Sequence, residues 1–217
     1  KRNIMERIYA VGDIHGRFDK LLDLLNRIEM DFNSDRLVFL GDYVDRGEQS
    51  YEVIEYLVDL KNRHPYPKTV FLKGNHEDMM EKYLAGKDRL TWLINGGQQT
   101  LESYMQHHED SEAPLIPESH RQFFDTLQLY HESENYIFVH AGLRKNVPLE
   151  KQKPEDLMWI RKKFIDTDFD FGKIVVFGHT PLQEPLLRPN KIGIDTGAVY
   201  GNKLTCVRLP ELVFYNA

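Results

Sequence analysis

Short apolar runs recur along the chain, and in its first half each run leads into a stretch with apolar residues at helical spacing. The three runs of the first half occupy residues 7–12, 36–41 and 69–74. The stretches that follow them occupy residues 18–30, 51–60 and 77–84. Short apolar runs predict buried strands, and a spacing of three and four residues predicts helices. Three successive strand–loop–helix units predict parallel strands joined by right-handed crossovers.

The second half contains apolar runs without a regular helix between each pair. These runs occupy residues 136–140, 173–178, 191–195 and 203–209. We expect them to form a second sheet packed on the first, which predicts an α/β fold with two packed mixed β-sheets, a β-sandwich flanked by helices. The length of 217 residues is typical of one domain, so we expect a single domain over residues 1–217.

Five short polar motifs occur along the chain, each directly after an apolar run. They are Gly12-Asp13-Ile14-His15-Gly16, Gly41-Asp42-Tyr43-Val44-Asp45-Arg46-Gly47, Gly74-Asn75-His76-Glu77, His140-Ala141-Gly142 and Gly178-His179-Thr180. Ligands of parallel sheets gather beyond the carboxyl ends of the strands, where the first three motifs are expected. Aspartate, asparagine and histidine suit hard or borderline divalent cations. The motifs therefore predict a metal site.

The candidate metal ligands form two sets that share one aspartate. The first set is Asp13, His15 and Asp42, and the second set is Asp42, Asn75, His140 and His179. Two neighbouring cations need an anion between them, which Asp42 would provide. In such sites the ions lie roughly 3.5–4 Å apart, and a hydroxide bridging them attacks phosphorus in line. These ligands predict two divalent ions per chain, with Mn²⁺ the first choice and iron or zinc as alternatives.

Arginines and a second histidine complete the predicted site. Arg46 and Arg161 are expected to bind the phosphate, because a guanidinium pairs with phosphate oxygens through two parallel hydrogen bonds. His76 is expected to act as general acid on the leaving oxygen, with Asp45 holding it charged and oriented. Asn75 and His76 are also expected to contact the phosphate.

Several residues near these motifs have more than one interpretation. Glu77 is expected to cap or orient its loop instead of taking part in the chemistry. The sequence Asn95-Gly96-Gly97 predicts a turn, with lining of the substrate pocket as the alternative. Residues 86–130 also contain four candidate contacts for a polyphosphate chain or an adenine ring: Lys87, Arg89, Trp92 and Arg121.

Composition and charge limit the kinds of binding partner that we expect. Hydrophobic residues make up 41% of the chain and charged residues 29%, and the formal net charge is -6. A negative net charge argues against an extended nucleic-acid surface. Cys206 is the only cysteine, which excludes an internal disulfide and favours a reducing compartment. We therefore expect a cytoplasmic protein that binds neither nucleic acid nor membranes.

Taken together, the five motifs resemble those of the phosphoprotein phosphatases, a family of metal-dependent serine/threonine phosphatases. The resemblance extends from Val11 to about Ala198 and includes residues 195–198. It is closest to the bacterial and phage branch, whose last motif reads Gly-His-Thr-Pro, as residues 178–181 do here. It implies a calcineurin-like metallophosphoesterase fold, the six metal ligands given above, phosphate-binding Arg46 and Arg161, and an acid pair of His76 and Asp45. The chain is shorter than the eukaryotic members, so we expect no obligate regulatory subunit.

Three functions are compatible with these motifs. The leading hypothesis is a phosphomonoesterase that acts on phosphoserine and phosphothreonine in proteins, with phosphotyrosine as a further substrate. The second is a symmetrical hydrolase of dinucleoside polyphosphates such as diadenosine tetraphosphate. The third is a metal-binding scaffold without catalysis, against which the intact His76, Asp45 and both arginines argue. The motifs thus predict the reaction more sharply than the group attached to the phosphate.

Overall fold

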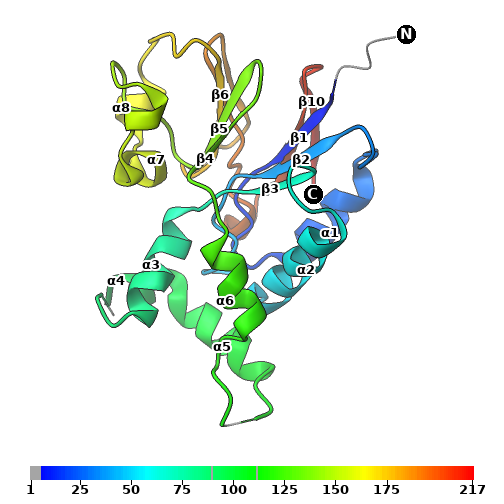
Figure 1. Ribbon diagram of the computed structural model, residues 1–217, viewed down its shortest axis with the longest axis vertical. Coiled ribbons are helices and arrows are strands. Elements are labelled where there is room, and N and C mark those ends of the chain that lie inside the picture. The colour runs from blue at the N-terminus through cyan, green and yellow to red at the C-terminus, as the bar shows by residue number, and fades with distance from the viewer. Residues whose placement is uncertain (1–5, 89, 111) are drawn as a thin grey trace.

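Two packed β-sheets with helices on their outer faces make up the computed structural model, which describes residues 6–88, 90–110 and 112–217 (Figure 1). The first sheet has the strand order β10-β9-β1-β2-β3. Its strands are β1 (Ile8–Val11), β2 (Arg36–Phe39), β3 (Thr69–Phe71), β9 (Thr205–Leu209) and β10 (Val213–Asn216). The strands β1, β2 and β3 are parallel, as the repeated strand–loop–helix pattern predicts. Arg89 and residues 1–5 lie outside the described residues.

The second sheet has the strand order β4-β5-β6-β8-β7. Its strands are β4 (Tyr130–Glu132), β5 (Tyr136–Val139), β6 (Ile174–Phe177), β7 (Leu186–Arg188) and β8 (Lys191–Gly193). The strands β5, β6 and β8 are parallel, and β4 and β7 are antiparallel edge strands. Both sheets are therefore mixed, and the predicted fold class is confirmed.

The strand expected at 203–209 belongs to the first sheet, so its predicted place in the second sheet is wrong. It forms β9, which pairs antiparallel with β1 in a register that sets Ile8 opposite Leu209. Both faces of β9 are buried, with Val207 facing the other sheet and Cys206 facing the helices. A strand buried on both faces has no pattern that identifies its partner. Its sheet membership depends instead on the path of the chain after β8.

The helices lie outside the two sheets, mostly on the side of the first sheet (Figure 1). This side carries α1 (Phe18–Arg27), α2 (Ser50–Arg63), α3 (Asn75–Leu84), α4 (Leu90–Trp92), the π-helical turn η1 (Leu93–Gly97), α5 (Gln98–Gln106) and α6 (Glu118–Asp125). Beside the second sheet lie the short turn η2 (Leu149–Lys151), α7 (Pro154–Trp159) and α8 (Lys162–Ile165), and a further turn, η3 (Ala198–Tyr200), precedes β9. Within the described residues, no helix has the length and apolar character needed to cross a membrane.

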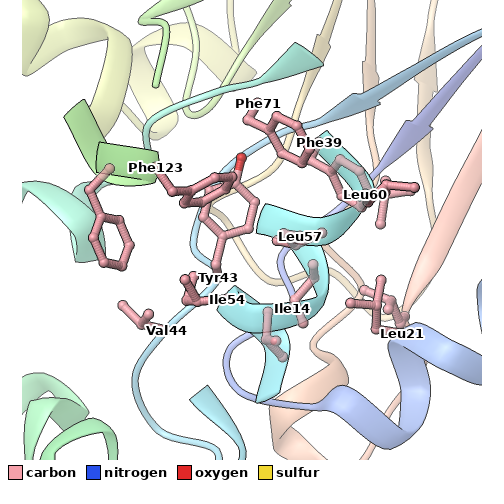
Figure 2. Packing of buried hydrophobic residues seen from close by; sticks show 14 of the residues in the cluster. Ile14, Leu21, Phe39, Tyr43, Val44, Ile54, Leu57, Leu60, Phe71 and Phe123 are labelled. Atoms are coloured by element: carbon pink, nitrogen blue, oxygen red, sulfur yellow. The ribbon is translucent and has the colours of Figure 1, made fainter. Parts of the chain in front are cut away.

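Three layers of buried apolar side chains hold the sheets and helices together. The layer between the sheets includes Ala10, Val38 and Val176. The layer between the first sheet and its helices is rich in aromatic residues, and Figure 2 shows Tyr43 close to Phe71 and Phe123. A third layer covers the outer face of the second sheet. Burial on both faces explains why the strands are nearly continuous apolar runs.

Candidate metal centre and phosphate-binding site

The five polar motifs come together where the carboxyl ends of the strands of both sheets meet. The first motif follows β1, the second follows β2, the third starts α3, and the last two follow β5 and β6. Backbone hydrogen bonds join these loops, because the amides of Ile14 and His15 donate to the carbonyl of Asp42, and the amide of Gly178 donates to that of His140. The two sheets therefore contribute to one site, as the motif positions predict.

Asp42 lies between two groups of side chains that could hold metal ions. One group is His15, Asp42 and His76, and the other is Asp42, His140 and His179. In each group the ligand atoms lie within 4.8 Å of one another. Oδ2 of Asp42 is 3.5 Å from Nε2 of His15, and Oδ1 is 3.4 Å from Nε2 of His140. The two oxygens face different groups, which is the arrangement that a bridging carboxylate needs.

The histidine rings are oriented so that a nitrogen remains available to a cation. Nδ1 of His15 donates to the carbonyl of Val44 at 2.9 Å, and Nδ1 of His140 donates to that of Leu40 at 2.8 Å. Because a carbonyl can only accept, Nδ1 carries a proton, and Nε2 is the nitrogen left to bind a cation once the ring is neutral. Among the described residues, the buried Nε2 of His179 has no hydrogen-bond partner. These observations fit a metal site, since most buried polar atoms find hydrogen-bond partners.

The other two proposed ligands, Asn75 and Asp13, lie beside these groups. Oδ1 of Asn75 is 3.0 Å from Nε2 of His140. The carboxylate of Asp13 accepts from the amide of His179 at 3.0 and 3.1 Å and lies outside both groups. Burial, together with the negative charge of Asp195, raises the pKa of Asp13 well above its usual range. A cation bound here would offset the repulsion between these neighbouring carboxylates.

Electrostatics divide the histidines into two kinds. Burial lowers the pKa of His15 to about 3. Burial and the adjacent charge of His140 lower the pKa of His179 to about 2, so both rings are neutral. Burial opposes the charge on His140 as well, but the Asp42 carboxylate outweighs it and raises the pKa of His140 to about 9. The same pairing holds the pKa of Asp42 well below its usual range despite its burial.

His76 and Asp45 form a buried pair directly beside this centre. Nδ1 of His76 lies 2.7 Å from Oδ2 of Asp45, and Nε2 of His76 lies 4.0 Å from Oδ2 of Asp42. Burial raises the pKa of Asp45 to about 8 and lowers that of His76 to about 4. The pair as a whole therefore keeps one acidic proton near neutral pH without net charge. The pair has the geometry that proton donation from His76 would need.

Two residues that the sequence analysis did not connect with the acid pair bind Asp45. Nε1 of Trp92 donates to both carboxylate oxygens of Asp45 at 3.0 and 2.8 Å, and the Thr100 hydroxyl donates to Oδ1 at 2.7 Å. Trp92 is fully buried, so this candidate contact offers no surface for stacking on an adenine ring. A buried indole N–H needs a hydrogen-bond acceptor. The presence of a tryptophan was therefore the only feature of the sequence that indicated a contact of this kind.

The two arginines differ in how they approach the site. One guanidinium nitrogen of Arg46 lies 2.7 Å from Nε2 of His15, and the group also faces the ring of Tyr200, with Cζ 5.7 Å from its centroid. Arg161 is exposed at the start of α8, and its charge contributes to lowering the pKa of both His76 and His179. Arg46 therefore contacts the centre directly, while Arg161 lies at its rim.

The loops that carry these residues have an unusual backbone. Five non-glycine residues of the motifs have positive φ angles: His15 (48°), Asp42 (52°), Asp45 (74°), Arg46 (70°) and His179 (66°). Such angles are uncommon outside glycine, and they cluster where function requires a particular geometry. The buried carboxylate of Glu77 supports the second motif by accepting hydrogen bonds from the amides of Asp42, Tyr43, Val44 and Gly74.

Comparison with known proteins identifies the class to which this site belongs. The sequence model of the calcineurin-like phosphoesterases matches residues 6–208. The chain therefore belongs to the calcineurin-like phosphoesterase family, whose members are hydrolases that use divalent metal ions. This result confirms the predicted enzyme class.

Individual relatives carry two different names. Serine/threonine-protein phosphatase 1 of Salmonella typhimurium is 31% identical over 207 residues, which cover 93% of this chain and 91% of the relative. Bis(5'-nucleosyl)-tetraphosphatase PrpE [asymmetrical] of Anoxybacillus flavithermus is 27% identical over 227 residues, covering 93% and 90%. The resemblance to phosphoprotein phosphatases is thus confirmed, while the substrates named among the relatives differ.

Solved structures share the fold at lower identity. A provisionally named diadenosine tetraphosphatase has a TM-score of 0.75 at 23% identity, covering 99% of this chain and 94% of its own. A protein serine/threonine phosphatase from Saccharomyces cerevisiae has a TM-score of 0.67 at 20% identity, covering 94% and 72%. At these identities the likeness supports the fold.

Proposed function

We propose that the protein is a two-metal phosphomonoesterase that hydrolyses phosphoserine and phosphothreonine in proteins, with phosphotyrosine as a further substrate. The observation that carries this proposal is the position of Asp42 between two ligand groups, with Arg46 and the His76–Asp45 pair alongside. These groups together serve one phosphoryl group and its leaving oxygen. The proposal thus needs no further anion-binding residue.

The residues present fit two divalent ions. Asp13, His15 and Asp42 would hold one ion, and Asp42, Asn75, His140 and His179 would hold the other. The unpartnered Nε2 of His179 and the carbonyl-bound Nδ1 atoms of His15 and His140 support these roles. The oxygen and nitrogen donors suit Mn²⁺, with iron or zinc as alternatives. Such ions lower the pKa of a coordinated water toward neutrality and so supply the nucleophile.

Side chains of the protein would hold the phosphate and move the proton. Arg46 and Arg161 would bind the phosphate oxygens, with Asn75 and His76 contacting the same group. As the P–O bond to the serine oxygen breaks, His76 would give its proton from Nε2 to that oxygen. Asp45, whose Oδ2 is hydrogen-bonded to Nδ1 of His76, would keep the ring oriented during this transfer.

Hydrolysis of dinucleoside polyphosphates is a second candidate function. Tyr200 and Trp159 expose 61% and 39% of their surface, and their rings lie beside Arg46 and His179, respectively. Exposed rings at a phosphate site are suited to stacking on a nucleobase. The name of the PrpE relatives specifies asymmetrical cleavage, whereas the motifs suggested a symmetrical hydrolase. This candidate would require the dinucleotide to bind along those rings.

A parallel assay separates the two candidates. Turnover of a phosphoserine peptide and of diadenosine tetraphosphate is measured with Mn²⁺ at one ionic strength. We expect a higher kcat/KM for the peptide, because one phosphoryl group requires only the residues described above. Far more efficient cleavage of the dinucleotide would contradict the proposal. In that case Tyr200→Ala should selectively lower kcat/KM for the dinucleotide, since stacking contributes about 1–3 kcal/mol per base.

A further inference from the structure

The segment from Trp92 to Thr100 lies outside the five motifs, yet it contacts the acid pair. It comprises the end of α4, the turn η1 and the start of α5. Trp92 and Thr100 are separated from Asp45 by 47 and 55 positions, and both are fully buried against it. This segment has no role in the reaction proposed above.

Hydrogen bonds from three side chains surround the carboxylate of Asp45. Oδ1 accepts from Trp92 and Thr100, and Oδ2 accepts from Trp92 and is hydrogen-bonded to Nδ1 of His76. Donors from different directions fix the plane of the carboxylate, so the oxygen that meets His76 is held in place. Without the first two donors, the carboxylate could rotate and the imidazole with it.

The Thr100 hydroxyl also constrains the backbone of Asp45. Its oxygen accepts from the amide of Asp45 at 2.9 Å while its proton goes to Oδ1 of the same residue. Ser50 Oγ lies 3.1 Å from the Thr100 hydroxyl and 3.2 Å from the Asp45 amide. Asp45 has a φ of 74°, a conformation that side-chain-bearing residues rarely adopt. Thr100 thus supports both the backbone and the side chain of Asp45.

The π-helical turn η1 is shaped to bring this segment against the second motif. The amide of Arg46 donates to the carbonyl of Gly96 at 3.1 Å. A Cβ atom on Gly96 would lie 2.7 Å from the Arg46 nitrogen, and a Cβ on Gly97 would overlap the ring of Trp92. Both glycines are therefore required by close packing. Gly96 has a φ of 107°, outside the helical range, so the chain bends at this point between α4 and α5.

Packing alone does not account for the polar contacts of this segment. The ring of Trp92 packs against Tyr83 at a centroid distance of 4.5 Å and belongs to the core beside the helices. A core role explains the ring but not the direction of the indole N–H. It also does not explain why a buried threonine stands at position 100, where valine has a similar shape. The polar atoms of both residues point to one carboxylate.

We propose that Trp92 and Thr100 are positioning residues, which fix the carboxylate of Asp45 so that His76 presents Nε2 to the leaving oxygen. This inference rests on the proposed role of His76 as general acid. It assigns the Asn95-Gly96-Gly97 sequence, expected to form a turn or to line the substrate pocket, to the support of Arg46 and Trp92.

The test compares two substrates whose leaving groups differ in how strongly they require protonation. A phosphoserine peptide has an alkoxide leaving group that requires protonation, whereas p-nitrophenyl phosphate has a leaving group that barely requires it. Thr100→Val should lower kcat for the peptide about 10–100-fold, the usual effect of removing a supporting hydrogen bond at a metal site, with KM and metal content nearly unchanged. The loss on p-nitrophenyl phosphate should be much smaller.

Matched variants keep the test decisive. Thr100→Ser retains the hydroxyl and should restore most of the activity toward the peptide. Thr69→Val removes another buried threonine hydroxyl, at the start of β3, and should not change the ratio between the substrates. If Thr100→Val fails to fold, Trp92→Phe replaces it, because phenylalanine keeps a ring and removes the N–H donor. Equal losses on both substrates, or unchanged turnover in a folded variant, would overturn the inference.

His76→Asn, assayed on the same substrates, separates this inference from the proposed function. If His76→Asn loses activity equally on both substrates, the general-acid role itself is wrong. If His76→Asn affects the peptide selectively but Thr100→Val and Trp92→Phe do not, only the positioning role is wrong.

Discussion

The two sides of the centre differ in what their polar atoms contact. On the side of the proposed metal ligands, Nε2 of His179 is buried and unpartnered among the described residues, and Nε2 of His15 faces a carboxylate and a guanidinium. On the side of the acid pair, both oxygens of Asp45 accept hydrogen bonds from side chains. Within this site, the unpartnered nitrogen of His179 is suited to binding a ligand, and the saturated carboxylate of Asp45 is suited to holding His76 in position.

This difference predicts different consequences of mutation. Changes on the ligand side should alter metal content and turnover together, whatever the substrate. Changes on the acid side should leave metal content intact and affect substrates according to their leaving groups.

Asp42→Asn should have the largest effect, because Asp42 belongs to both ligand groups. Losing the bridge removes several kcal/mol of transition-state stabilisation at each ion, so hydrolysis of any substrate should fall by more than about 10⁴-fold. Activity on p-nitrophenyl phosphate and metal content measure this effect. Asp59→Asn, at an exposed position on α2, is the control. Substantial activity with a normal metal content in Asp42→Asn would contradict the bridging role.

His76→Asn should reduce turnover of a phosphoserine peptide by about 10²–10⁴-fold, the usual contribution of a general acid. The metal content should stay nearly intact, because His76 is proposed as the acid and not as a ligand. His76 nevertheless lies within 4.8 Å of the ligand atoms of His15 and Asp42. Loss of a metal ion in this variant would place His76 on the ligand side instead.

Metal affinity should depend on pH through His140. The Asp42 carboxylate, acting against burial, raises the pKa of His140 to about 9, so this ring is protonated below that pH. A metal ligand must be neutral, so binding has to release this proton. Release of one proton predicts an affinity that falls about tenfold per pH unit as the pH is lowered from 8 to 6. Calorimetric titration with Mn²⁺ at several pH values measures it, and a pH-independent affinity would contradict the combination of a raised pKa and a ligand role for His140.

Glu77→Gln should have a smaller effect than the changes above, and this effect should be a loss of stability. The buried carboxylate of Glu77 accepts from four backbone amides, and a glutamine would turn an N–H₂ group toward some of these donors. Leaving such groups unpaired predicts a loss of about 2–3 kcal/mol in the free energy of unfolding. Urea unfolding of this variant beside Glu81→Gln, a half-exposed position on the same helix, measures it. Equal stability of the two variants would contradict the supporting role.

Much of the fold followed from local patterns in the sequence. The apolar runs predicted β1, β2, β3, β5, β6 and β8 near their observed positions. The edge strands β4, β7 and β10 were missed, because short and mostly half-buried strands carry little apolar signal. The sheet membership of β9 also escaped prediction, because burial on both faces leaves no pattern that indicates a partner.

The site was predictable where its residues follow strands and not where it depends on distant contacts. The motif positions predicted that Asp42, His140 and His179 would meet, since the ends of the strands converge. No local pattern indicates that Trp92 and Thr100 bind Asp45, because these contacts join helices inserted after α3 to a loop far earlier in the chain. The positive φ angles of the motif residues likewise arise from packing of the whole fold.

In the proposed function, catalysis depends on two divalent ions held around Asp42. Its most direct test measures metal content and p-nitrophenyl phosphate turnover on the same samples, before and after chelation and after addition of Mn²⁺. We predict up to two ions per chain, loss of activity when they are removed, and recovery as the second equivalent of Mn²⁺ binds. Full activity in protein without detectable metal would contradict the account.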